Sequence, residues 1–167
     1  GGADALLQRV ELGEDCGGVF TTADAGDGIE PRHREHVAHV FFVDDNLFVD
    51  VPRAKELFQA LIPLGIRWFC QTSIDIARDR ELVALMARSG CFMALFGFES
   101  LHRDNLRQMR KAWNVKWQSY EESIDVVQDA GIMIYGTFVH GYDHDTPSSF
   151  DDTVEFAIRH KFCLANF

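Results

Sequence analysis

Polar side chains follow four apolar runs of this chain, at the point where each run ends. These polar segments are Asp44-Asp45-Asn46, Gln71-Thr72-Ser73, Glu99-Ser100 and the stretch from His140 to Asp145. A carboxylate directly after an apolar run needs a partner or a function, because an unpaired buried charge is costly. Carboxylates and hydroxyls also bind the ammonium and hydroxyl groups of small ligands. The same residue types are common in turns and helix caps, and this second interpretation stands beside the first for each of them.

The apolar runs alternate with segments whose apolar residues recur at helical spacing. We predict strands that begin near His39, Ile66, Cys91, Ile132 and Phe162, with helices between them and a short extra helix around residues 104–109. Strands joined by helices pair in parallel, and ligands bind at the carboxyl ends of parallel strands. The pattern therefore predicts an α/β fold whose polar segments gather at one rim. A partial barrel and an open doubly wound sheet both fit it.

Local signals mark the ends of several helices. Asp79 has the position of an N-cap, and Thr146-Pro147 has the composition of a helix start. Three apolar residues of that last helix are predicted to face inward: Phe150, Val154 and Ala157. Glycine interrupts the first 36 residues repeatedly. We predict an irregular segment at 1–36, with a short helix at Ala5 to Val10, and one domain at 37–167.

Length and composition limit the classes of protein. The chain has 167 residues, of which 47% are hydrophobic, enough for one domain with a core. Its formal net charge of −10 argues against a nucleic-acid groove. No apolar run approaches the roughly 20 residues that span a bilayer, and no basic region followed by an apolar stretch marks a signal peptide. We expect a cytoplasmic protein with a small-molecule ligand, no nucleic-acid partner and no membrane span.

Three of the segments resemble motifs of a known family. Phe41 to Asn46 resembles the second-strand motif of the radical S-adenosylmethionine (SAM) enzymes. The segment from Phe96 to Ser100 is similar to their fourth-strand motif, and the segment from Gly136 to Thr146 is similar to their fifth-strand motif. The order and spacing also match. The combination is most similar to the cobalamin-binding branch, in which a B12-binding domain precedes the barrel.

This resemblance implies a partial parallel (β/α) barrel that holds strands two to six of the radical SAM fold. It implies SAM as a cofactor that is cleaved reductively to a 5′-deoxyadenosyl radical in the intact parent, with methyl transfer in the cobalamin branch. The residues that it assigns to SAM are Asp44, Asp45 and Asn46 at the methionyl amino group, Glu99 and Ser100 at the ribose, Phe138 to Gly141 (including His140) at the adenine, and Thr72 or Ser73 along the pocket.

The chain departs from the family in its cysteines. The family's CxxxCxxC loop supplies three thiolates to a [4Fe–4S] cluster. The four cysteines here are Cys16, Cys70, Cys91 and Cys163, and their spacing does not form that motif. We expect the last three to be small core residues. The resemblance therefore implies a fragment in which the cluster, a further N-terminal part of the barrel and a B12-type domain belong to the intact parent.

Two other functions remain open from the residues alone. The acids of the rim, together with His140, have the chemistry of a divalent-metal-dependent barrel hydrolase, although no His-x-His occurs. A non-catalytic module that binds a nucleotide-like ligand is the second alternative. We expect no metal site formed by this chain and no catalysis by the chain in isolation.

Overall fold

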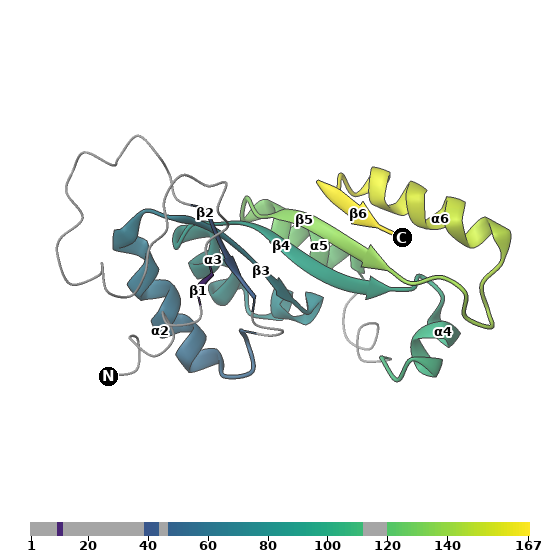
Figure 1. The fold of residues 1–167 in the computed structure, drawn as a ribbon, viewed down its shortest axis with the longest axis horizontal. Coiled ribbons are helices and arrows are strands. Elements are labelled where there is room, and N and C mark those ends of the chain that lie inside the picture. Colours follow the sequence, from purple (N-terminus) through teal and green to yellow (C-terminus); the bar gives the residue numbers. More distant parts are fainter. Residues whose placement is uncertain (1–9, 12–38, 44–46, 112–119) are drawn as a thin grey trace.

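The structure is a computed structural model that describes residues 10–11, 39–43, 47–111 and 120–167 (Figure 1). Its strands are β1 Val10–Glu11, β2 His39–Phe42, β3 Arg67–Thr72, β4 Cys91–Glu99, β5 Met133–Phe138 and β6 Leu164–Asn166. Its α-helices are α2 Val51–Leu61, α3 Arg80–Arg88, α4 Arg103–Gln108, α5 Tyr120–Asp129 and α6 Pro147–Arg159. Two 3₁₀ helices, η4 Ile62–Leu64 and η5 Ile74–Arg78, lie on either side of β3. Strands thus alternate with helices, as the sequence pattern predicts.

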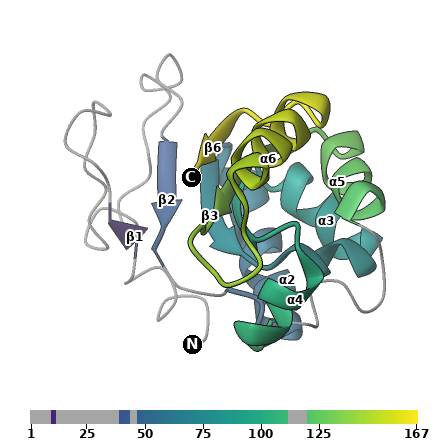
Figure 2. The same cartoon turned by 90° about the vertical axis from the view of Figure 1, so that its right-hand side faces the viewer.

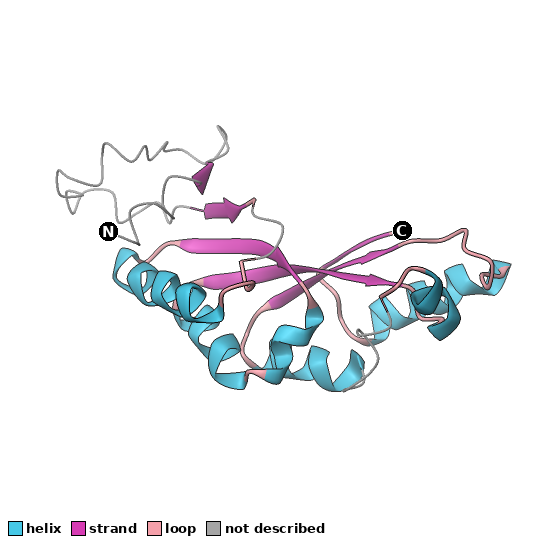
Figure 3. Ribbon diagram, turned by 90° about the horizontal axis from the view of Figure 1, so that it is seen from below, coloured by secondary structure: helices cyan, strands magenta, loops and turns pink. Residues whose placement is uncertain are grey.

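The described strands form one sheet in sequence order, from β1 to β6. Strands β2 to β6 pair in parallel. The helices lie on one face of this sheet and leave the other face open (Figures 2 and 3). Strands in sequence order with helices on one face are typical of a (β/α) barrel, because a doubly wound sheet reverses its order and carries helices on both faces. The partial barrel is therefore confirmed, and the doubly wound sheet was wrong.

Strand β1 corrects one local prediction. Val10 pairs with Phe42 of β2 in an antiparallel ladder, so it lies in a strand and not at the end of a helix. Backbone pairing with the edge of β2 outweighs the weak local preference for a helix. The rest of the predicted helix lies outside the described residues.

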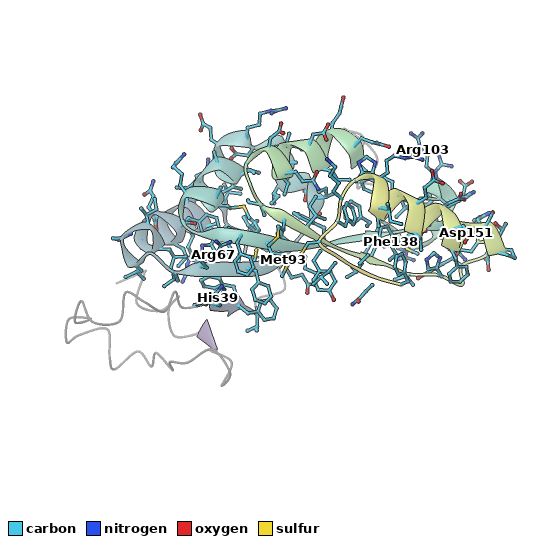
Figure 4. All side chains as sticks on the ribbon, turned by 90° about the horizontal axis from the view of Figure 1, so that it is seen from above. His39, Arg67, Met93, Arg103, Phe138 and Asp151 are labelled. Atoms are coloured by element: carbon cyan, nitrogen blue, oxygen red, sulfur yellow. The ribbon has the colours of Figure 1, made fainter. Side chains whose placement is uncertain are left out.

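Side chains of the sheet alternate between a buried helix face and the open face. Trp68 and Phe96 are fully buried beneath the helices. The Trp68 indole N–H donates to the Ser89 carbonyl at 3.0 Å and to the Ser89 hydroxyl at 3.2 Å, so its polar group is satisfied in the core. Figure 4 places His39 and Arg67 at one end of the sheet and Phe138 at the other. The second end is the carboxyl end of the strands, where the predicted site lies.

Helix α3 begins as its sequence predicts. The Asp79 carboxylate accepts a hydrogen bond from the Leu82 backbone N–H at 2.9 Å. Helix α6 also begins at Pro147, after the capping residue Thr146. None of the helices in the described part of the chain is long and apolar enough to cross a bilayer.

The predicted inward face of α6 was wrong for two of its three residues. Phe150 is 51% exposed and Val154 is 42% exposed, whereas Ala157 is buried. The buried stripe consists of Thr153, Phe156 and Ala157, which follow an i, i+3, i+4 pattern. Local spacing alone did not decide which of two possible stripes meets the sheet.

Candidate functional site

Glu99 ends β4 in a backbone conformation that is rare for glutamate. Its φ is +66°, and the Ser100 N–H donates to the Phe98 carbonyl at 2.8 Å, which closes a γ-turn around it. A γ-turn with positive φ is the strained form. The pairing of β4 with β5 also shifts its register between Gly97 and Glu99, as at a β-bulge. At this bulge the carboxylate of Glu99 lies over Gly97, two residues earlier in the chain.

Neighbouring elements hold this turn in place. The Val139 N–H, just after β5, donates to the Glu99 carbonyl at 2.7 Å. The ring of Phe98 is fully buried and stacks on Phe138, with ring centroids 5.6 Å apart. The Tyr120 hydroxyl of α5 donates to the Phe98 carbonyl at 3.0 Å. Strand β5 and helix α5 therefore anchor both sides of the turn.

The Glu99 carboxylate lies over Gly97 and beside a cation. A Cβ atom at Gly97 would overlap the carboxylate, so only glycine leaves room for this side-chain position. The Lys111 ammonium forms an ion pair with Glu99, whose side chain is 15% exposed while that of Lys111 is 41% exposed. The end of β4 thus offers a carboxylate and an ammonium group at one partly buried place. Sequence reasoning missed Lys111, because it lies 12 residues after Glu99 and no local pattern marks it.

A buried amide connects the segments that follow β4 and β5. Asn105 of α4 is fully buried, and its amide N–H groups donate to Asp145 at 2.7 Å and to the Ser100 hydroxyl at 3.4 Å. The Asp145 carboxylate in turn accepts the backbone N–H of Gly141 at 2.8 Å and that of Tyr142 at 2.9 Å. Sequence reasoning missed Asn105 too, since a six-residue helix shows no reliable periodicity.

The side chains of the predicted adenine segment differ in how far they are buried. Phe138 is buried among other aromatic rings, so its ring is not available to a ligand. The His140 ring stacks on the Phe150 ring, with ring centroids 4.2 Å apart. Both nitrogens of His140 are buried without a hydrogen-bond partner among the described residues. Gly141 has a φ of +101°, a conformation that suits glycine.

The remaining predicted site residues have different outcomes. Ser73 is half-buried directly after β3, one strand away from β4, and its hydroxyl does not cap η5. Asp44, Asp45 and Asn46 lie outside the described residues, so their predicted contact with an amino group stays a prediction.

The acids of the described rim are engaged with protein partners. Asp145 binds Asn105 and two backbone N–H groups, and Asp143 accepts a hydrogen bond from Gln108 at 2.7 Å. Within the ranges that the structure describes, no group of three or more His, Cys, Asp or Glu residues is placed to hold a metal ion.

The cysteines show mixed outcomes. Cys70 and Cys91 are buried in the core, as predicted, and burial followed by the proximity of Cys70 raises the pKa of the Cys91 thiol. Cys163 is exposed just before β6, so its predicted place in the core was wrong. The Cys163 N–H still pairs with the Ile134 carbonyl at 2.9 Å, which fixes its backbone and leaves its side chain in solvent.

Comparisons with known proteins identify the family. The chain is 34% identical over 120 residues to bacteriochlorophyllide d C-12(1)-methyltransferase of Chlorobaculum tepidum, covering 72% of the chain and 26% of that protein. It is 32% identical over 100 residues to cytidylyl-2-hydroxyethylphosphonate methyltransferase of Streptomyces wedmorensis, covering 59% of the chain and 18% of that protein. The chain thus spans about a quarter or less of the length of these relatives.

A solved structure has the same fold. The radical SAM methyltransferase TsrM of Kitasatospora setae, with cobalamin and a [4Fe–4S] cluster bound, superposes with a TM-score of 0.62 at 14% identity, over 75% of this chain and 26% of that one. The sequence profile of the radical SAM superfamily matches residues 17–157. Because this match covers more than half of the chain, the chain belongs to the radical SAM superfamily.

Proposed function

We propose that the carboxyl ends of β4 and β5 bind the adenosine portion of SAM, as one part of a longer radical SAM enzyme. The observation that carries this proposal is the position of Glu99, whose carboxylate lies over Gly97 in a strained turn. Backbone strain that the surroundings maintain is concentrated at binding and active sites. A partly buried carboxylate at this rim is also the right acceptor for two adjacent ribose hydroxyls.

Neighbouring residues supply complementary chemistry. Lys111, which pairs with Glu99, offers a cation for the carboxylate of the methionyl group. The backbone at Val139 lies beside Glu99, and the segment that continues to Gly141 would offer the adenine a peptide edge. Ser100 supports the turn, because its hydroxyl accepts hydrogen bonds from the His102 N–H and from Asn105.

The other residues that the family resemblance assigns complete the proposed site. They are Asp44, Asp45 and Asn46 at the amino group, His140 near the adenine and Ser73 along the pocket. Each keeps the role that its position in the family motif implies. Removing any of them singly is expected to weaken SAM binding without changing the fold of the described core.

The [4Fe–4S] cluster does not fit the residues present. Its ligands are three closely spaced thiolates, whereas Cys70 and Cys91 are buried in the core and the sequence has no CxxxCxxC motif. We therefore assign the cluster and the cobalamin to other parts of the longer protein. SAM bound at the carboxyl ends of β4 and β5 and in contact with that cluster would supply a methyl group or a 5′-deoxyadenosyl radical. Because two relatives are named methyltransferases, we propose methyl transfer as the activity of the whole protein.

Binding of S-adenosylhomocysteine tests the adenosine site. This analogue keeps the adenosine and lacks the methyl group, so it needs no reductive chemistry. We expect saturation-transfer NMR signals from its adenine and ribose protons with the unmodified chain. We expect Glu99→Gln to weaken binding roughly 10- to 100-fold, since hydrogen bonds to a charged group contribute about 1.5–3 kcal/mol.

A matched control separates a local effect from a general loss of charge. Glu155 lies on the exposed surface of α6 and pairs only with Arg159 among the contacts described for it. Glu155→Gln removes the same charge from the exposed surface of α6 and is expected to leave binding unchanged. Equal binding by the Glu99→Gln variant and the unmodified chain would refute the role of Glu99. No binding by the unmodified chain would refute the site itself.

A further inference from the structure

Asn105 is a polar side chain with no exposed surface and with all of its hydrogen-bonding groups in use. Its amide nitrogen donates to the Asp145 carboxylate at 2.7 Å and to the Ser100 hydroxyl at 3.4 Å. Its amide oxygen accepts the His144 backbone N–H at 3.1 Å. A buried amide that is satisfied from three directions fixes one arrangement, because any displacement leaves a buried group unpaired.

The partners of Asn105 come from two different strand ends. Ser100 directly follows Glu99 at the end of β4, whereas His144 and Asp145 belong to the segment between β5 and α6. Asp145 extends this hydrogen-bond network, since its second oxygen accepts the Gly141 and Tyr142 N–H groups. The amide of Asn105 therefore ties the turn at Glu99 to the backbone that leaves β5.

Two weaker contacts reinforce this connection. Gln108 of α4 donates to Asp143 at 2.7 Å. The rings of His102 and His144 stack in parallel, with centroids 5.3 Å apart. Both contacts are exposed, so they guide the segment without fixing it as a buried amide does. Helix α4 thus acts as a clamp, and Asn105 is its buried centre.

We infer that Asn105 is a positioning residue that holds the ribose side and the adenine side of the adenosine site in one fixed relation. This inference rests on the proposed function, because it assigns Glu99 to the ribose and Val139 to Gly141 to the adenine. Asn105 acts through Asp145 and Ser100 and touches no ligand itself. Removing the Asn105 amide is expected to leave both halves of the site intact and to let them move relative to each other.

A reciprocal exchange of two side chains tests the connection. Asn105→Asp places two carboxylates in contact and removes the N–H donor, so it breaks the link. The double variant Asn105→Asp, Asp145→Asn restores one carboxylate and one amide at the same two positions. In the double variant the amide at position 145 donates its N–H to the carboxylate at position 105, and its oxygen accepts the Gly141 N–H. We expect the double variant to recover what the single variant loses.

Two measurements on the full chain give the readouts. Hydrogen–deuterium exchange of the peptide that contains Gly141 and Tyr142 reports the connection, and exchange in the single variant is expected to be at least about tenfold faster. Saturation-transfer NMR with S-adenosylhomocysteine reports the site, and affinity is expected to fall at least about tenfold and to return in the double variant. Circular dichroism confirms that each variant folds.

A control variant separates positioning from general destabilisation. Ser89→Ala removes a buried hydroxyl that accepts from Trp68 at the opposite ends of the strands. It is expected to lower stability without lowering affinity for S-adenosylhomocysteine.

The outcomes distinguish the two proposals. Unchanged affinity in Asn105→Asp, with faster exchange, would overturn the inference and leave the proposed function standing. Failure of the double variant to recover affinity would also overturn the inference. Absence of binding by the unmodified chain would overturn the proposed function, and with it the site that Asn105 positions.

Discussion

Replacing Glu99 by glycine is expected to give a chain that is more stable than the alanine variant and yet binds the nucleoside more weakly than the unmodified chain. Both substitutions remove the ion pair with Lys111, so that loss cancels between them. They differ in the backbone, because φ is +66° at this position and a Cβ atom there costs roughly 1–2 kcal/mol. Glycine also loses about 0.5–1 kcal/mol more conformational entropy on folding than alanine does. We therefore expect Glu99→Gly to exceed Glu99→Ala by up to about 1.5 kcal/mol in free energy of unfolding.

Gln71 is the control position, because we expect its glycine variant to be less stable than its alanine variant. It lies within β3 and is not among the described non-glycine residues with positive φ. Glycine inside a strand costs roughly 0.5–1 kcal/mol relative to alanine, because it loses more conformational freedom on folding. The order of the two variants should therefore reverse between positions 71 and 99.

Urea denaturation followed by far-ultraviolet circular dichroism measures both pairs. Saturation-transfer NMR with S-adenosylhomocysteine on the same samples should show weakened binding in both Glu99 variants. A Glu99→Gly variant less stable than Glu99→Ala would refute the strained turn. Retained binding in the glycine variant would show that the site does not require the carboxylate of Glu99.

Three further outcomes follow from contacts in the core and at helix ends. The hydrogen bond from the first turn of α3, followed by Lys55, lowers the pKa of Asp79 below its ordinary value of 3.8. Its stabilising contribution is therefore present above pH 3.8 and lost as the pH falls below it, so the stability difference between the unmodified chain and Asp79→Asn should shrink on acidification in urea denaturation. Trp68→Phe should lower the free energy of unfolding by about 2–4 kcal/mol in the same assay. About 1–3 kcal/mol of this comes from the Ser89 carbonyl left unpaired and about 1 kcal/mol from the smaller ring, so a loss below about 2 kcal/mol would contradict the prediction. Among the described thiols Cys163 should react first with iodoacetamide, by peptide mass spectrometry, because the other two are buried.

Much of the fold follows from local pattern. Apolar runs, caps such as Asp79 and glycine stops predicted each strand and helix of the repeating unit, because these signals act over a few residues. The motif around Glu99 could be identified for the same reason, since an acid directly after an apolar strand is visible in the sequence.

The choice between a barrel and a doubly wound sheet needed the structure. That choice depends on which strands become neighbours and on which face the helices cover, and both are decided by long-range pairing. The same holds for the face of α6, where Phe150 was expected in the core and lies half exposed. Two stripes of similar hydrophobicity compete on such a helix, and only packing against the sheet selects one.

The geometry of the candidate site was decided almost wholly by tertiary structure. The sequence alone determined that an acid ends the third apolar run, that glycine lies two residues before it, and that no CxxxCxxC motif occurs in the chain. The turn at Glu99 is maintained by a hydrogen bond from Val139, 40 residues later, and Asn105 meets Asp145 across the same separation. Contacts between such distant residues leave no local pattern, because they exist only when β4 and β5 lie side by side.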